Sequence, residues 1–188
     1  MPGRYGSEPP DSDGIRPPGF APVDGGGVPG DISMRDLRRL FSGPVTVVTT
    51  ADDQGFHGIT VSAFCVTSLA PPVVLICLGS QGEARATVET SSRFAVSLLS
   101  DRQEFLADRF AGRAPLVNSR FDGVKYRLTG HGLPVLEEGL AWFDCEVSGT
   151  LDVGDHVAIV GRVIEAGYGT GTEPLLYFDG AYRTVTFS

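Results

Sequence analysis

The stretch that decides the fold of this chain is VTVVTTADDQGFHGITVSAFCVT, residues 45–67. Its first six residues are all β-branched, which favours a strand. Residues 51–55 are polar and end in glycine, as is typical of a turn. Residues 58–67 then read as a second strand, so the stretch predicts a β-hairpin.

Short helices and further strands are expected on either side of this hairpin. Helices are predicted at 34–41 and 83–91, and a third at 101–111 begins with an Asp101–Glu104 capping box. Their expected apolar faces are Leu37, Leu40 and Phe41 in the first, and Phe105, Leu106 and Phe110 in the third. The other predicted strands are 73–78, 94–99, 141–151, 155–166 and 181–187, with a proline-bearing loop at 68–72. Many strands with few short helices indicate a mainly β fold, a closed or nearly closed antiparallel barrel.

Residues 1–30 differ from the remainder in composition, being rich in glycine and proline and poor in apolar side chains. Such a segment buries too little surface to offset its ordering entropy, so we expect a disordered tail. Residues 31–188 are expected to form one domain.

Charge and composition exclude several classes of protein. The net charge of −8 argues against nucleic-acid binding, which needs an electropositive face. No apolar run approaches the roughly 20 residues of a membrane helix, and no secretory signal is evident, so we expect a soluble cytoplasmic protein with no membrane partner. The three cysteines lie far apart in apolar stretches and are expected to be buried, and no Cys/His spacing predicts a metal site.

Four short polar motifs are candidates for binding a ligand. Thr60 and Ser62 alternate within the predicted second strand, and Ser68 lies in the proline-bearing loop. Gly79-Ser80-Gln81-Gly82 precedes a predicted helix that carries Arg85, an arrangement that offers donors to a phosphate. Gly154-Asp155-His156 is a glycine turn that leads into an apolar strand. Taken singly, each motif is equally explained by an ordinary turn or a half-polar strand, and His57 and His131 are interpreted as surface residues in turns.

Taken together and in order, these motifs resemble those of the short-chain flavin reductases of two-component monooxygenases, in the flavin reductase-like split-barrel family. The resemblance runs from about residue 34 to residue 187. It rests on the segments 41–50, 58–64, 68–72, 93–99, 109–112, 119–121, 132–136, 154–156, 161–163 and 174–178.

The resemblance implies a homodimeric split β-barrel that binds FAD or FMN and NADH, with NADPH less favoured. It implies hydride transfer between the cofactors with no catalytic side chain, and delivery of reduced flavin by diffusion to a separate monooxygenase. The flavin contacts that it implies are Thr60, Ser62, Ala63, Ser68, Leu69, Cys77, Gly79, Ser80, Arg85, Phe110, Ala111 and Gly112. The implied nicotinamide contacts are Arg35, His156 and Tyr177. Two alternatives stay open: a protein that retains its flavin and reduces a small organic substrate, and a non-catalytic flavin-binding module.

Overall fold

The computed structural model describes residues 33–81, 83–114 and 121–185. The predicted tail, residues 1–30, lies outside the described residues. In the N-terminal part of the chain, α1 (Met34–Arg39) begins after Ser33, whose carbonyl accepts hydrogen bonds from two residues of the first turn. The predicted apolar face of this helix is wrong, because α1 ends before Leu40 and contains no buried residue.

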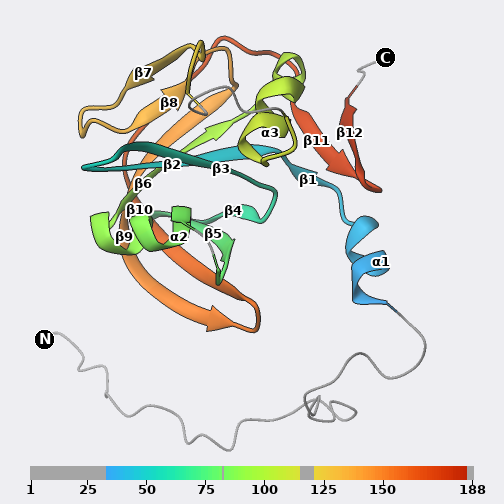
Figure 1. Cartoon of the computed structure of the whole chain (residues 1–188), viewed down its shortest axis with the longest axis horizontal. Helices are drawn as coiled ribbons and strands as arrows, with labels where there is room; N and C mark the ends of the chain where they lie inside the picture. The colour runs from blue at the N-terminus through green and yellow to red at the C-terminus, as the bar shows by residue number, and fades with distance from the viewer. Residues whose placement is uncertain (1–32, 82, 115–120, 186–188) are drawn as a thin grey trace, which may run out of the picture. The chain divides into compact units, whose positions relative to one another are not determined.

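One seven-stranded sheet forms most of the body that follows (Figure 1). In spatial order its strands are β3 (Gly55–Val61), β2 (Thr46–Asp52), β6 (Arg93–Leu98), β9 (Ala141–Val153), β10 (His156–Tyr168), β5 (Pro72–Gly79) and β4 (Phe64–Leu69). Every pair of neighbouring strands in this sheet is antiparallel.

The two edge strands of this sheet, β3 and β4, are joined by only two residues, Ser62 and Ala63, which we call the barrel corner. Thr46 Oγ1 donates to the carbonyl of Val61 at 2.7 Å, on the β2 side. The N–H of Cys77 donates to the carbonyl of Ala63 at 3.0 Å, on the β5 side. A sheet whose opposite edges meet within two residues has to curl upon itself, and the split β-barrel predicted from the sequence is confirmed.

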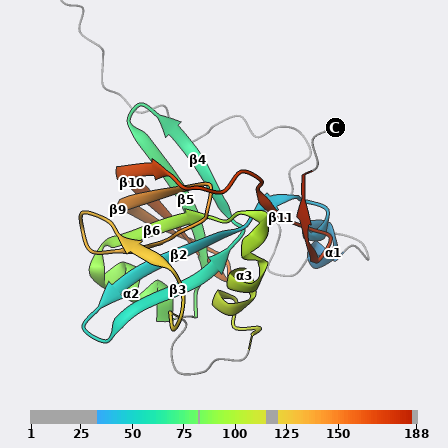
Figure 2. The same ribbon diagram turned by 90° about the horizontal axis from the view of Figure 1, so that it is seen from above.

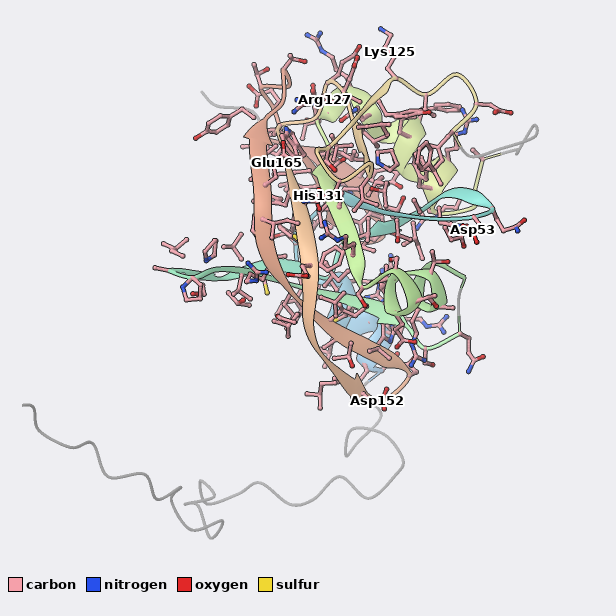
Figure 3. The ribbon with its side chains drawn as sticks, turned by 90° about the vertical axis from the view of Figure 1, so that its left-hand side faces the viewer. Asp53, Lys125, Arg127, His131, Asp152 and Glu165 are labelled. Carbon is pink, nitrogen blue, oxygen red and sulfur yellow. The ribbon has the colours of Figure 1, made fainter. Side chains whose placement is uncertain are left out.

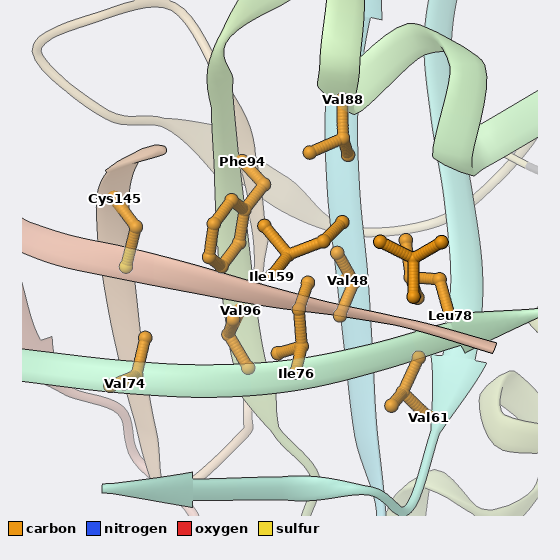
Figure 4. Close-up of a cluster of buried hydrophobic side chains, with 11 residues drawn as sticks. Val48, Val61, Val74, Ile76, Leu78, Val88, Phe94, Val96, Cys145 and Ile159 are labelled. Carbon is orange, nitrogen blue, oxygen red and sulfur yellow. The ribbon is translucent and has the colours of Figure 1, made fainter. Parts of the chain in front are cut away.

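The inside of the curled sheet is filled by one cluster of apolar side chains, the inner core (Figure 4). Most of its members come from β2, β5, β6, β9 and β10, at alternate positions as the two-residue period of a strand requires, while Val61 ends β3 and Val88 comes from helix α2, residues 83–91. They are Val48, Val61, Val74, Ile76, Leu78, Val88, Phe94, Val96, Cys145, Val157 and Ile159.

Shorter elements cover the outside of the barrel. A three-stranded sheet comprises β1 (Gly43–Pro44), β11 (Leu175–Phe178) and β12 (Ala181–Thr184), and β7 (Tyr126–Leu128) pairs with β8 (Pro134–Leu136). The helices are α2 (Glu83–Ser91), the 3-10 turn η1 (Asp101–Gln103) and α3 (Glu104–Phe110), which lies beside β3 (Figure 2). The strands β1, β7, β8 and β11 were not predicted, because two to four residues are too few to show a period.

Two predicted boundaries, one within the stretch 45–67 and one directly after it, are wrong. The single strand at 58–67 is divided by the barrel corner, so Thr60 belongs to β3 whereas Ser62 follows its end. The loop at 68–72 is a tight hairpin instead: Ser68 and Leu69 end β4, Pro72 begins β5, and only Ala70 and Pro71 connect them. Both errors arise because the β4–β5 pairing is set by the barrel and not by local sequence.

The start of the third helix is also corrected. Ser100 is the N-cap, and its N–H donates to Gln103 Oε1 at 3.0 Å, one residue before the predicted Asp101–Glu104 box. Phe105 is exposed, and Ala107 takes the predicted core position beside Phe110, because the first turn is a 3-10 helix that rotates the buried face.

Two predictions about single residues are wrong as well. Cys65 is exposed, because it faces outward from the edge strand β4, whereas Cys145 is buried and Cys77 is half-buried. His57 lies in β3 and not in a turn, and its Nε2 is 2.9 Å from Asp52 Oδ1 across the hairpin. None of the helices in the described part of the chain has the length and apolar character that crossing a membrane requires.

Replacing Gly161 by alanine is expected to destabilise the barrel. A Cβ at this position of β10 would overlap the Phe94 ring and lie 3.0 Å from Cys145 Cβ, both in the inner core. Overpacking of this kind costs about 1–3 kcal/mol. Gly149→Ala, on the facing strand, is the control, because its Cβ meets no atom within 4 Å. Denaturant unfolding of both variants checks this, and equal unfolding free energies would contradict it.

Candidate functional site

Four of the candidate residues meet where β5 ends, and we call this group the β5 end: Gly79, Ser80, Arg85 and His156. Gly79 is the direct cross-strand partner of His156 on β10. The N–H of Ser80 donates to the carbonyl of Asp155 at 2.9 Å. Arg85 Nη1, from the first turn of α2, donates to the carbonyl of Ser80 at 2.8 Å. The structure therefore brings a glycine, a hydroxyl, a guanidinium and an imidazole together.

His156 follows the two-residue turn Gly154-Asp155 that joins β9 to β10, and Gly154 adopts a positive φ of 61°. Its Nδ1 lies 2.7 Å from Asp155 Oδ1, and its side chain is 42% exposed. A carboxylate at Nδ1 fixes the proton on that nitrogen, so in the neutral ring Nε2 is a hydrogen-bond acceptor that points elsewhere. His156 can therefore engage a ligand through Nε2.

The β5 end has room for a ligand. A Cβ built on Gly79 meets no atom of the described residues within 4 Å, so on their side the backbone is open to close approach. Arg85 is held from two sides, because its Nε also donates to Glu89 Oε1 at 2.9 Å. A guanidinium oriented in this way beside an open glycine and a serine is suited to a phosphate group.

A second set of candidates gathers around α3. Thr60 Oγ1 donates to the carbonyl of Ala107 at 2.6 Å, which ties β3 to this helix. The Phe110 ring is fully buried against Phe121, with centroids 5.0 Å apart, so only its backbone is left to approach a ligand. Ala111 and Gly112 are exposed and end the helix, with Gly112 at a φ of 73°.

Tyr177 on β11 lies in a polar cluster that the sequence analysis did not identify. The Arg113 guanidinium lies 5.8 Å from the centre of the Tyr177 ring and 3.4 Å from Asp108 Oδ1. Tyr182 donates its hydroxyl to the same carboxylate at 3.0 Å. Burial, followed by the hydrogen bond to Asp108, raises the pKa of Tyr182 to about 12. These residues belong to two segments far apart in the sequence, 108–113 and 177–182, so no motif in the sequence could have revealed them.

The barrel corner connects the two sets. The carbonyl of Ala63 accepts from Cys77, two residues before Gly79 on β5. A Cβ on Gly43 would lie 3.3 Å from the carbonyl oxygen of Ser62, and Gly43 is the cross-strand partner of Tyr177. Cys77 faces outward, and burial raises the pKa of its thiol. Because the thiol is then less often ionised, Cys77 offers a ligand an apolar contact rather than a nucleophile.

Ser68 and Leu69 lie at the other end of the β4–β5 hairpin. Ser68 is opposite Val73, and Leu69 is 87% exposed. At a strand rise of about 3.3 Å per residue, the six steps from Val73 to Gly79 span about 20 Å. A ligand that touches both ends has to lie along the hairpin or receive one set of contacts from a second copy. Arg35, on α1, belongs to the N-terminal part of the chain, and its role stays a prediction.

Comparisons with known proteins agree with this geometry. The family model described as "Flavin reductase like domain" matches residues 37–186. A probable flavin reductase of Rhizobium meliloti is 36% identical over 153 residues; the match covers 81% of this chain and 48% of the relative, so the chain spans about half the relative's length. The reductase subunit HsaB of a flavin-dependent monooxygenase from Mycobacterium tuberculosis is 32% identical over 155 residues, covering 81% of each chain.

A solved structure is similar over most of its length. It is the NADH:FAD oxidoreductase SgcE6 of Streptomyces globisporus in complex with NAD and FAD fragments. It matches with a TM-score of 0.74 and 32% identity, covering 82% of this chain and 90% of that one.

The Thr60 hydroxyl is expected to stabilise the fold. Thr60→Val keeps the shape of the side chain but removes one of the two hydrogen bonds that the Ala107 carbonyl accepts, the other coming from the N–H of Ala111, and this loss costs about 0.5–1.5 kcal/mol. Thr60→Ser retains the hydroxyl and is the control. Urea unfolding without any added ligand measures this, and a Thr60→Val protein as stable as the wild type would show that the bond contributes nothing.

Proposed function

This chain belongs to the flavin reductase-like family, and we propose that it uses NADH to reduce FAD or FMN and releases the reduced flavin for a separate monooxygenase. The chemistry is supplied by the cofactors: a hydride and its electron pair pass from the nicotinamide C4 to the flavin N5. The protein has to hold two planar rings against each other and stabilise the negative charge of the reduced flavin.

The observation that carries this proposal is the geometry of the β5 end. Gly79, which the family resemblance assigns to the flavin, is opposite His156, which it assigns to the nicotinamide cofactor, and the flavin candidates Ser80 and Arg85 adjoin through the Ser80–Asp155 and Arg85–Ser80 hydrogen bonds. Hydride transfer needs both cofactors at one place, and this arrangement brings their candidate ligands together.

Each residue of the β5 end has a definable task in this proposal. Arg85 and Ser80 hold the phosphate side of the flavin, and the open backbone at Gly79 allows close approach. His156, oriented by Asp155, accepts a hydrogen bond at Nε2 from an amide of the nicotinamide cofactor. No side chain needs to exchange a proton during the transfer.

NADH is proposed over NADPH from the names of similar proteins and not from the sequence, which places Arg35, Arg38 and Arg39 together in α1. The similar solved structure is named as an NADH:FAD oxidoreductase and holds NAD and FAD fragments, which supports the same pair. A monooxygenase partner is supported by the relative HsaB, which is named as the reductase subunit of a flavin-dependent monooxygenase.

We further propose that the protein is a cytoplasmic homodimer. Leu151 and Val153 on β9 are both at least half exposed. Leu151 is opposite Ala158, which is opposite Cys77, so these side chains share the outer face of the sheet. Scattered apolar residues need no explanation, but several on one sheet face favour a partner surface. A second copy is also the simplest source of contacts from the distant Ser68 and Leu69.

Purified protein is expected to oxidise NADH only when FAD or FMN is added, without any organic substrate. Absorbance at the nicotinamide band follows the reaction, and gel filtration shows whether flavin stays bound. A rate equal to the flavin-free background would refute the reductase proposal. Flavin that co-elutes with the protein would favour one of the two retained-flavin alternatives.

Leu151→Asp is expected to convert a dimer into monomers and to weaken flavin binding. The substitution places a charge at the centre of the proposed apolar interface. Phe105→Asp, at an equally exposed position on α3, is the control and should leave the mass unchanged. Light scattering coupled to gel filtration measures both. A monomeric wild-type protein with full activity would rule the dimer out.

His156→Ala is expected to raise the KM for NADH while leaving the flavin Kd nearly unchanged. One lost hydrogen bond to a polar cofactor group is worth about 1.5–3 kcal/mol, or roughly tenfold or more in kcat/KM. His57→Ala, which removes another histidine paired with an aspartate, is the control. Thermal unfolding is measured alongside, and a kinetic defect explained wholly by lost stability would remove His156 from the site.

A further inference from the structure

A cluster of three metal-ligating side chains lies apart from the candidate flavin site, on the side of the barrel covered by β7 and β8 (Figure 3). His131 comes from the turn between β7 and β8, Asp144 from β9 and Glu165 from β10. Asp144 and Glu165 are direct cross-strand partners, so their side chains leave the sheet together. Each of the three residues offers one ligand atom, and these atoms all lie within 4.8 Å of one another.

Asp144 is the unusual member of this cluster. It is 0% exposed, and its Oδ2 lies 3.0 Å from His131 Nδ1. Its other oxygen, Oδ1, is buried and has no hydrogen-bond partner among the residues that the structure describes. A buried carboxylate oxygen without a partner is costly, because it loses its hydration and receives nothing in exchange. Folding alone therefore does not explain why an aspartate occupies this position.

The charges of the cluster are not balanced by the surrounding protein. Asp144 and Glu165 bring two carboxylates together, and among the described residues no lysine or arginine forms an ion pair with either of them. The one basic partner is His131. A divalent cation would supply the missing positive charge.

The turn that carries His131 is held in place independently of any ion. Thr129 Oγ1 accepts from the N–H groups of His131 and Leu133, at 3.3 and 3.2 Å. The N–H of Gly130 donates to Glu165 Oε2 at 2.9 Å, which fixes this carboxylate against the turn. Next to the cluster, Ala95, Leu133, Val135 and Trp142 form a buried apolar group. Ligands that are oriented in advance are what a tight metal site requires.

We propose that His131, Asp144 and Glu165 bind a divalent transition-metal ion, zinc first among them. One imidazole nitrogen and two carboxylate oxygens are ligands that zinc accepts at tetrahedral sites, and a water molecule completes the four. His131 binds through Nδ1 and releases the proton that it otherwise shares with Asp144.

The site is structural and separate from the flavin site. Glu165 lies nine residues along β10 from His156, about 30 Å at the rise of a strand. A metal there fastens the β7–β8 hairpin to β9 and β10.

The test uses the full chain, treated with EDTA and then freed of it, and zinc chloride as the probe. Zinc is expected to bind with a stoichiometry of one per chain in calorimetry. At a concentration a hundredfold above its Kd, it should raise the Tm by roughly 5 °C or more. Glu165→Gln should abolish most of this shift. Asp144→Asn should abolish it as well, if circular dichroism shows that this buried variant folds.

His57→Gln is the matched control. His57 Nε2 and Asp52 Oδ1 form a similar pair at 2.9 Å, outside the three-residue cluster. This variant should therefore keep the full zinc shift. The proposal is overturned if zinc leaves the wild-type Tm unchanged, or if Glu165→Gln responds to zinc as the wild type does.

Discussion

The closure of the sheet at Ser62 and Ala63 is the constraint on which the remaining structure depends. Within two residues the backbone stops pairing with β2 and begins to pair with β5, as the bonds of Val61 and Ala63 show. The two edge strands do not pair with each other in the described sheet, and the corner joins them through the chain alone. The same two residues lie at the junction of the two sets of candidate ligands. The connection that closes the barrel therefore also brings the two sets together.

Closure also gives every strand an inner and an outer face with different tasks. On β5 and β10, Ile76, Leu78, Val157 and Ile159 fill the inner core, while Cys77 and Ala158 face outward. Because the period of a strand is two, the register that buries the first set also places Gly79 opposite His156. If β10 slipped by one residue against β5, the inner core side chains would become exposed. The same slip would separate Gly79 from His156.

Two polar side chains beneath the outer elements differ in whether all of their polar atoms have hydrogen-bond partners. The Thr60 hydroxyl is satisfied by the carbonyl of Ala107 and fastens α3 to the barrel. Asp144, under β7 and β8, keeps one oxygen without a partner among the described residues although it is fully buried. A polar group with a hydrogen-bond partner can be explained by stability alone. A buried carboxylate oxygen without one, beside two further metal-ligating side chains, favours the proposed metal ion.

The sequence by itself determined the mainly β class, most of the long strands, helix α2 and the glycine turn before His156. These follow from local properties: β-branching, residue period and the backbone freedom of Gly154. The tertiary structure alone decided where the strand at 58–67 breaks, that Gly79 meets His156, that Arg113 reaches Tyr177, and that His131, Asp144 and Glu165 converge. These features join segments far apart in the chain. Their cause is the closing of the barrel, which no local pattern of residues encodes.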